Sequence, residues 1–143
     1  MLVKEVMTTS VETTQPDRSL QEAAERMKTL NVGPLPVCNA DGRLVGMVTD
    51  RDITVRAVAQ GFGATMGAVR DVMSTDVVFC FEDQHVEDAA RLMRDNQIRR
   101  LPVLNRNKKL VGIVSLGDLA VETQNEEMIG ETLEKISEPL SHK

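Results

Sequence analysis

Apolar residues recur at helical spacing in two places along this chain. One set lies between residues 20 and 27 and the other between residues 86 and 93. Residues three and four apart share one face of an α-helix, so each set predicts an amphipathic helix. The two predicted apolar faces are Leu20, Ala23, Ala24 and Met27, and Val86, Ala89, Ala90 and Met93.

Short apolar runs after each helix predict pairs of strands. These runs are LPVC (35–38) and LVGMV (44–48), then LPVL (101–104) and LVGIV (110–114). The intervening NADGR and NRNKK are typical of hairpin loops. We also expect an extended piece before each first helix, at Val11–Thr13 and Val77–Phe79, and a second helix after each strand pair, at 51–58 and 117–122. The order β-α-β-β-α, written twice, predicts a mixed α/β fold of the α+β type.

The start of the first helix also has a sequence signal. Ser19 precedes the apolar face, and Glu22 follows three residues later. This spacing predicts an N-cap with a capping box.

The two halves of the chain are copies of one unit. Residues 3–54 align with residues 69–120 without a gap, and 18 of the 52 aligned positions are identical. A single unit of about fifty residues buries little surface, so we expect the halves to pack together with a ligand cleft between them. The predicted divisions are a first repeat at 1–59, a glycine-rich linker at 60–68, a second repeat at 69–123, and a carboxyl-terminal helix and tail at 124–143.

The carboxyl-terminal helix has no counterpart in the first repeat. Residues 124–137 place Ile129, Leu133 and Ile136 on one stripe, which predicts an amphipathic helix. Such a helix either covers the core or meets a partner protein, and we favour the first reading.

Charge and composition exclude several classes of partner. The net charge is −5 and aromatic residues are 2% of the chain, which argues against nucleic acid as a partner. No apolar run approaches the roughly 20 residues that span a bilayer, so no membrane partner is expected. The first residues lack a charged region followed by an apolar one, and we therefore expect a cytoplasmic protein.

Cysteine and histidine offer no metal or catalytic pattern. Cys38 and Cys80 are not equivalent in the repeat, and their spacing matches no metal motif. The two histidines, His85 and His142, stand at a helix start and near the carboxyl terminus. No nucleophile with an adjacent base is visible, so we expect neither a metal site nor an enzyme.

One stretch in each repeat carries candidate chemistry. A strand ends, a hydroxyl residue follows, and an aspartate comes three positions later: Thr49 and Asp52 in one repeat, Ser115 and Asp118 in the other. Backbone N–H groups at a helix start favour phosphate, and a carboxylate accepts vicinal hydroxyl groups such as those of ribose. The same pattern is also that of a plain helix N-cap, so both readings stay open.

The combined pattern resembles a pair of cystathionine-β-synthase (CBS) domains, the Bateman module, over residues 3–122. The resemblance implies two units packed through their sheets about a pseudo-two-fold axis, and a homodimer of such pairs. It further implies clefts that bind AMP, ADP, ATP or S-adenosylmethionine, with no required cofactor and no enzymatic activity in stand-alone members.

The resemblance also implies roles for individual positions. Asp52 and Asp118 would hold ribose hydroxyl groups, and Thr49 and Ser115 would contact phosphate or ribose. Backbone groups around Thr13 and around Phe79 and Cys80 would line the adenine. The cleft walls would include Val32 and Pro34 in the first repeat, and Ile98, Arg99 and Arg100 in the second.

The two repeats differ at positions that bear on ligand charge. The second repeat carries Arg99 and Arg100 where the first has Gly33 and Pro34. The first repeat carries Asp50 and Arg51 where the second has Leu116 and Gly117. Arginine pairs well with phosphate, so we expect the second repeat to be the better anion site, with Asp50 weakening phosphate binding in the first. The alternative is that the two arginines lie on a solvated edge.

The predicted function is a regulatory module that senses adenosine-containing ligands and signals through its dimer or through an effector protein. The competing hypothesis is a structural dimerisation module whose clefts bind no ligand.

Overall fold

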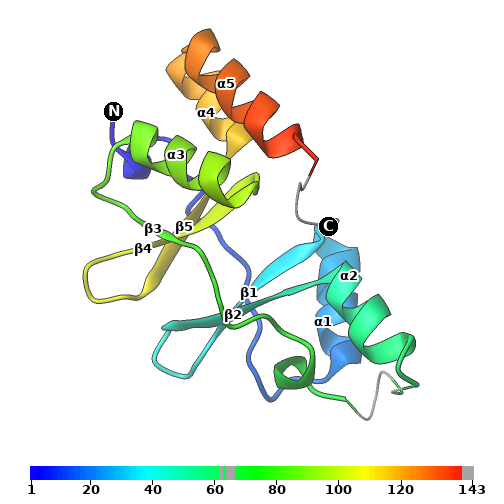
Figure 1. Cartoon of the computed structure of the whole chain (residues 1–143). Coiled ribbons are helices and arrows are strands. Elements are labelled where there is room, and N and C mark those ends of the chain that lie inside the picture. The colour runs from blue at the N-terminus through cyan, green and yellow to red at the C-terminus, as the bar shows by residue number, and fades with distance from the viewer. Residues whose placement is uncertain (62, 64–66, 140–143) are drawn as a thin grey trace. The chain divides into compact units, whose positions relative to one another are not determined.

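The computed structural model describes residues 1–61, 63 and 67–139. These residues form two compact units, each described here by itself (Figure 1). The β1–β2 unit comprises the described residues of Glu12–Val77, and the β3–β5 unit comprises residues 1–11 together with residues 78–139. The predicted linker at 60–68 and tail at 124–143 include residues 62, 64–66 and 140–143, which lie outside the described residues.

The β1–β2 unit contains an antiparallel hairpin, helices of the first repeat and a 3-10 turn from the start of the second repeat. Strand β1 (Pro34–Cys38) pairs with β2 (Leu44–Thr49), with Pro34 opposite Thr49. The helices are α1 (Leu20–Leu30), the four-residue α2 (Asp50–Ile53), a π-helical turn η2 (Thr54–Val58) and a 3-10 turn η3 (Val69–Asp71).

The β3–β5 unit contains a three-stranded sheet of order β3-β4-β5. Strand β3 (Cys80–Phe81) runs parallel to β4 (Arg100–Leu104), which pairs antiparallel with β5 (Leu110–Ser115). The helices are η1 (Val3–Glu5), α3 (Val86–Asn96), α4 (Leu116–Thr123) and α5 (Glu126–Ser137).

The predicted mixed α/β class and the four hairpin strands are confirmed, with strand ends moved by one residue. The extended pieces expected at Val11–Thr13 and Val77–Phe79 were placed too early. In the second repeat the pairing begins at Cys80, and in the first it is a single bridge between Thr14 and Val37.

Both hairpin loops are held by an asparagine side chain. Asn39 Oδ1 accepts hydrogen bonds from the backbone N–H groups of Asp41 and Arg43, and Asn105 does the same two and four residues on. These side chains imitate a backbone turn, which explains why Asn occupies the same position in both copies.

The first helices of the repeats use different halves of the predicted capping box. Ser19 Oγ accepts from the Glu22 N–H at 3.0 Å, so the N-cap prediction is confirmed. The Glu22 carboxylate instead pairs with Arg18 at 3.4 Å, so the reciprocal half of the box was wrong. At α3 the reverse holds, because Asp88 Oδ2 accepts from the His85 N–H at 3.1 Å.

The beginning of each repeat packs into the unit built mainly from the other repeat. We call residues Val3–Val11 and Val69–Val77 the leading segments. Val3 and Val6 are buried in the core of the β3–β5 unit, whereas Val69 and Val72 are buried in that of the β1–β2 unit. Burial of a valine side chain contributes about 1.5–3 kcal/mol, so each unit is stabilised by a segment that belongs to the other repeat.

Each leading segment also pairs with the last strand of its host hairpin. The Thr8 N–H donates to the Ile113 carbonyl at 2.8 Å and the Ile113 N–H donates back at 3.0 Å. Ser74 and Met47 exchange the same pair of bonds, at 2.8 and 2.9 Å. Each hairpin therefore gains a further backbone-paired segment along one edge.

The repeated glycine of the LVG sequence makes this approach possible. A Cβ atom on Gly112 would lie 2.7 Å from Met7 Sδ and 2.9 Å from the Thr8 carbonyl oxygen. A Cβ atom on Gly46 would lie 2.8 Å from the Ser74 carbonyl oxygen. Only glycine admits another backbone at this distance, so the leading segment explains why both copies keep it.

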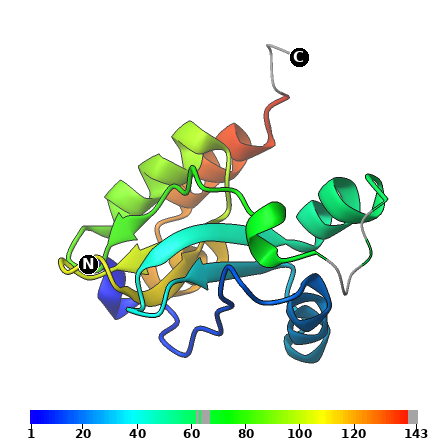
Figure 2. The ribbon, with the colours of Figure 1, turned by 90° about the horizontal axis from the view of Figure 1, so that it is seen from below.

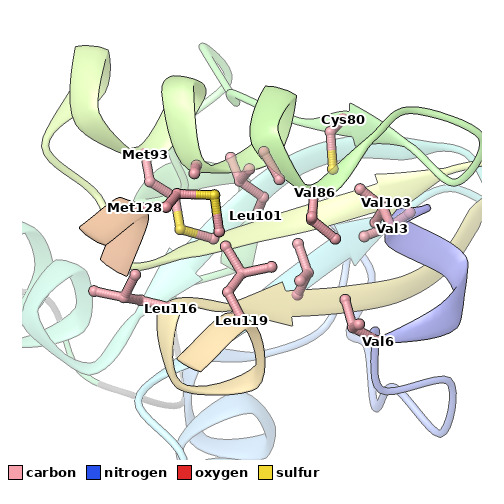
Figure 3. Close-up of a cluster of buried hydrophobic side chains, with 13 residues drawn as sticks. Val3, Val6, Cys80, Val86, Met93, Leu101, Val103, Leu116, Leu119 and Met128 are labelled. Carbon is pink, nitrogen blue, oxygen red and sulfur yellow. The ribbon is translucent and has the colours of Figure 1, made fainter. Parts of the chain in front are cut away.

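The core of the β3–β5 unit lies between its sheet and its helices (Figure 3). Met93 of α3 and Met128 of α5 lie close together beside Leu101 of β4, and Val3 enters from the leading segment. The flexible thioether side chains of methionine can fill irregular gaps between α3, α5 and the sheet.

Helix α5 covers this core, as we had favoured, and lies beside α3 in both views (Figures 1 and 2). Its buried residues are Met128 and Thr132, with Ile129 and Ile136 packed at the margin. The prediction that Leu133 belongs to the buried stripe was wrong, since its side chain is 41% exposed.

The equivalent helices α1 and α3 consequently differ in burial. Ala90 of α3 is buried, whereas its equivalent Ala24 on α1 is exposed, which corrects the predicted apolar face of the first helix. Repeat symmetry hides this difference, because the α5 segment follows only the second repeat.

Replacing Gly112 by alanine tests the close approach of the leading segment to β5. We expect Gly112→Ala to lower the free energy of unfolding by about 1–3 kcal/mol, because the new methyl group meets a carbonyl oxygen that is fixed by pairing. Urea unfolding measures this change.

Gly130→Ala in α5 is the matched control. A Cβ atom at Gly130 meets nothing within 4 Å, so this variant should be more stable by about 0.5–1 kcal/mol. Equal stability of the two variants would contradict the close approach of the leading segment to Gly112.

Candidate functional site at the strand–helix corners

The candidate residues of the first repeat gather where β1 begins and β2 ends. Thr49 is the last residue of β2 and lies opposite Pro34. Helix α2 starts immediately afterwards, and the Asp50 N–H donates to the Gly33 carbonyl at 3.1 Å. We call this arrangement the first corner.

The second repeat builds the same corner with different side chains. Ser115 ends β5 and lies opposite Arg100, and the Leu116 N–H donates to the Arg99 carbonyl at 2.8 Å. The structure therefore brings Arg99, Arg100, Ser115 and Asp118 together at what we call the second corner.

Both hydroxyl–aspartate pairs form reciprocal capping boxes. Thr49 Oγ1 accepts from the Asp52 N–H at 3.0 Å, and Asp52 Oδ2 accepts from the Thr49 N–H at 2.9 Å. Ser115 and Asp118 make the same two bonds at the same lengths. The hydroxyl hydrogens and the second carboxylate oxygens are not used by these bonds, so capping leaves them available to a ligand.

The second oxygens of the two aspartates have different surroundings. Asp52 Oδ1 lies 3.8 Å from Arg56 Nε, and Arg56 also donates to the Val72 carbonyl at 3.1 Å. In the second repeat Glu122 stands at the position of Arg56, and Asp118 Oδ1 has no partner among the residues that the structure describes. The sequence analysis missed Arg56, although its spacing of four from Asp52 on one helical face was a usable signal.

Asp50 occupies the first corner itself. Its Oδ1 atom accepts from the Arg51 N–H at 3.0 Å, and a Cβ atom on Gly33 would lie 3.0 Å from the same oxygen. The equivalent Leu116 is buried in the core of its unit. The corners therefore share a backbone and differ in charge.

The three predicted arginines are exposed. Arg51, Arg99 and Arg100 form no ion pair with any residue in the described ranges. Their guanidinium groups are thus accessible to a ligand, but exposure alone is equally compatible with a solvated edge.

The residues predicted to line an adenine lie further along the strands. Cys80 is opposite Val103, three residues from Arg100, which at the rise of a strand is about 10 Å from the corner. Thr14 has the same relation to Val37 and Pro34 in the first repeat.

The side chains of this lining differ in access. Cys80 is fully buried, so only its backbone could face a ligand, whereas Phe79 is partly exposed and meets Phe81 edge to face at 5.5 Å. Thr13 is partly exposed, and the backbone N–H and carbonyl groups of Thr14 are both paired with β1.

The predicted wall residues are also unequal. Val32 is 41% exposed, and Pro34 is partly exposed. Ile98 instead packs against the core of the β3–β5 unit. Among the three, Ile98 has the strongest structural role.

Thr13 also borders an open hollow of about 630 Å³ beside α1. Its lining includes Glu12, Glu22, Arg18 and Arg26, and no residue of the first corner. Both arginines are paired with glutamates, at 2.9 and 3.4 Å, so this hollow offers no unpaired cation to an anion.

Arg106 and Asp83 form an ion pair beside β3 that was not predicted from the sequence. Arg106 makes two hydrogen bonds to Asp83, at 2.8 and 2.9 Å, and lies 4.1 Å from the centre of the Phe81 ring. The Arg106 guanidinium lowers the pKa of the Asp83 carboxyl group. This contact links the second hairpin loop to the aromatic pair beside the predicted adenine lining.

Residues 1–61, 63 and 67–139 contain neither a metal-binding cluster nor a membrane-spanning helix. No group of three side chains there is arranged to hold a metal ion. No helix in those ranges is long and apolar enough to cross a bilayer.

Comparison with known proteins identifies the family. A model of the CBS domain matches residues 3–58 and 69–123. The chain therefore belongs to the CBS domain family and carries two such domains, as the resemblance implied. The CBS domain-containing protein YhcV of Bacillus subtilis is 48% identical over 140 residues, covering 98% of this chain and 98% of YhcV.

Two similar solved structures contain adenosine compounds. The CBS domain pair of protein MJ0100, in complex with 5′-methylthioadenosine and S-adenosylmethionine, is 28% identical with a TM-score of 0.75, covering 88% of this chain and 98% of that one. CBSX2 in complex with AMP is 27% identical with a TM-score of 0.74, again covering 88% and 98%.

The capping boxes predict a measurable contribution to stability. We expect Ser115→Ala to lower the free energy of unfolding by about 1 kcal/mol, because the Asp118 N–H loses its acceptor. For a chain of this size the midpoint should fall by about 2–4 °C. Ser10→Ala, at an exposed position, is the control, and identical melting of both variants would contradict the role of the cap.

The cysteines should be unreactive in the folded protein. Burial, with a smaller contribution from Asp88, raises the pKa of the Cys80 thiol to about 12, and burial also raises the pKa of Cys38. At pH 8 few thiolates are present, so a thiol reagent should modify both residues slowly until urea unfolds the chain. Rapid modification of Cys80 in the native protein would contradict its placement.

Proposed function

We propose that this protein is a regulatory module that senses adenosine-containing ligands at its strand–helix corners. The observation that carries the proposal is the paired arrangement of hydroxyl, carboxylate and helix start, present twice in a chain of the CBS family. The AMP complex of CBSX2 and the S-adenosylmethionine complex of MJ0100 support this class of ligand.

In the proposed mode of binding, the free oxygen of Asp118 accepts ribose hydroxyl groups. Ser115 and the neighbouring backbone contact ribose or phosphate, and the backbone near Phe79 lines the base. A nucleotide has its base at one end and its phosphate at the other, which suits recognition groups about 10 Å apart.

We propose the second corner as the better phosphate site. Arg99 and Arg100 supply two exposed guanidinium groups there, and the Gly117 N–H has no acceptor among the described parts of the chain. Charge-assisted hydrogen bonds from arginine are stronger than neutral ones and match the geometry of phosphate.

Signalling requires that the ligand bind one arrangement of the protein more tightly than another. We propose that the output passes through a homodimer or through an effector protein, with no catalytic step and no required cofactor. The exposed Leu133 and Val121 on α5 and α4 are apolar positions that an effector could contact.

A structural association module is the competing function. The observation that favours it is that Thr49, Asp52, Ser115 and Asp118 already satisfy one another as helix caps. In that case both corners would serve stability alone, and no adenosine compound would change the unfolding temperature.

Thermal unfolding with AMP, ADP, ATP, NAD and S-adenosylmethionine tests the proposal. A ligand at 100 times its dissociation constant adds about 2.7 kcal/mol, which for this size is a rise of several degrees. We expect the rise to disappear in Asp118→Ala or Asp52→Ala. No rise with any compound would leave the association module as the function.

A charge variant tests the phosphate site. We expect Arg100→Ala to weaken AMP binding about tenfold and to leave adenosine binding unchanged, because only the phosphate contact is lost. Arg70→Ala removes an exposed arginine of the β1–β2 unit and is the control. Equal AMP affinity in both variants would indicate that Arg100 lies on a solvated edge and does not contact the phosphate.

A further inference from the structure

The first helical turn at the first corner has no free N–H group. The Asp50 N–H donates to the Gly33 carbonyl, the Arg51 N–H donates to the Asp50 carboxylate, and the Asp52 N–H donates to Thr49. A phosphate at this corner would have to displace the Asp50 carboxylate from the Arg51 N–H. It would also approach the carboxylates of Asp50 and Asp52, of which the second has Arg56 beside it at 3.8 Å.

Among the described residues, the second corner has no carboxylate that could compete with a phosphate for the N–H group equivalent to that of Arg51. Leu116 replaces Asp50 and turns into the core, so the Gly117 N–H keeps no internal acceptor within the described residues. Arg99 replaces Gly33, the residue over which the Asp50 carboxylate lies. The missing side chain at Gly33 provides the room for that carboxylate, so the two differences belong together.

The capping boxes and the strand registers are shared by the two corners, whereas only Asp52 has an arginine, Arg56, 3.8 Å from its second oxygen among the described residues. Thr49 and Asp52 have the same bonds as Ser115 and Asp118, and the strand registers are equivalent. An aspartate can therefore accept ribose hydroxyl groups at both corners, while the group attached at the 5′ end meets the Asp50 carboxylate at the first corner and Arg99 and Arg100 at the second.

We infer that Asp50 is a specificity-determining residue that makes the first corner select adenosine compounds without a phosphate, neutral or carrying a cationic 5′ group such as a sulfonium. The carboxylate attracts a cation and repels a phosphate at close range. The second corner takes the phosphorylated nucleotide. One chain then reads two adenosine compounds of different charge. This inference rests on the proposed function.

Isothermal titration calorimetry on the full chain tests the inference. An Asp118→Ala, Arg100→Ala background leaves the first corner as the only complete site, and adenosine, AMP and S-adenosylmethionine are the probes. We expect adenosine and S-adenosylmethionine to bind this background at least about tenfold more tightly than AMP.

Two substitutions at Asp50 separate charge from shape. Asp50→Leu copies the second repeat, and Asp50→Asn keeps an acceptor for the Arg51 N–H while removing the charge. Both should raise AMP affinity in the background, by about tenfold for Asp50→Leu and less for Asp50→Asn, and both should weaken S-adenosylmethionine. Asp41→Asn, on the exposed hairpin loop, is the control for net charge.

The outcomes distinguish the inference from the proposed function. AMP binding to the background as tightly as adenosine, unchanged by either Asp50 substitution, overturns the inference and leaves the adenosine sensor intact. Adenosine binding to the wild type but not to the background also overturns it, because the first corner is then no site. Absence of binding by every probe to the wild type overturns the proposed function itself.

Discussion

The pairing of each leading segment with the hairpin of the other repeat is the interaction on which the rest of the structure depends. Thr8 exchanges backbone hydrogen bonds with Ile113, and Ser74 does so with Met47. The residue before each acceptor strand position, Gly112 or Gly46, has no side chain that would block this close approach. Because Val3 and Val69 are buried in the cores of these host units, each unit contains the leading segment of the other repeat, and the β3–β5 unit is built from two separate stretches of the chain. Duplication alone would allow two independent halves, whereas this exchange makes the folding of each repeat conditional on the other.

The same pairing fixes the corners. Each leading segment holds β2 or β5 on one edge, and β1 or β4 holds it on the other, so the strand end at Thr49 or Ser115 is constrained from two sides. The capping boxes then set the direction of the following helix. A binding group on such a framework loses little conformational entropy when a ligand arrives, which is the physical advantage of placing recognition at a strand–helix junction.

The sequence predicted what local chemistry and periodicity determine. The hairpins, the caps at Ser19, Thr49 and Ser115, and the repeat itself follow from spacing and turn residues, and they are confirmed. Ala24 and Leu133 were predicted to lie on buried faces but are exposed. Burial depends on which elements pack against a helix, and the periodicity of apolar residues does not contain that information. The bond from the Arg51 N–H to Asp50 was missed for a related reason, since several acceptors near a helix start compete for the same donor.

Fold and ligand place different demands on the two copies. The hydroxyl and aspartate at each corner stabilise it as caps, whether or not a ligand binds there. Gly33 and Asp50, with their counterparts Arg99 and Leu116, lie beside the cap without forming its reciprocal bonds. Substitution at these neighbouring positions can change the charge that a ligand meets while the cap stays intact. A duplicated corner can therefore diverge in specificity at little cost in stability, because the residues that hold it together are not the residues that distinguish one ligand from another.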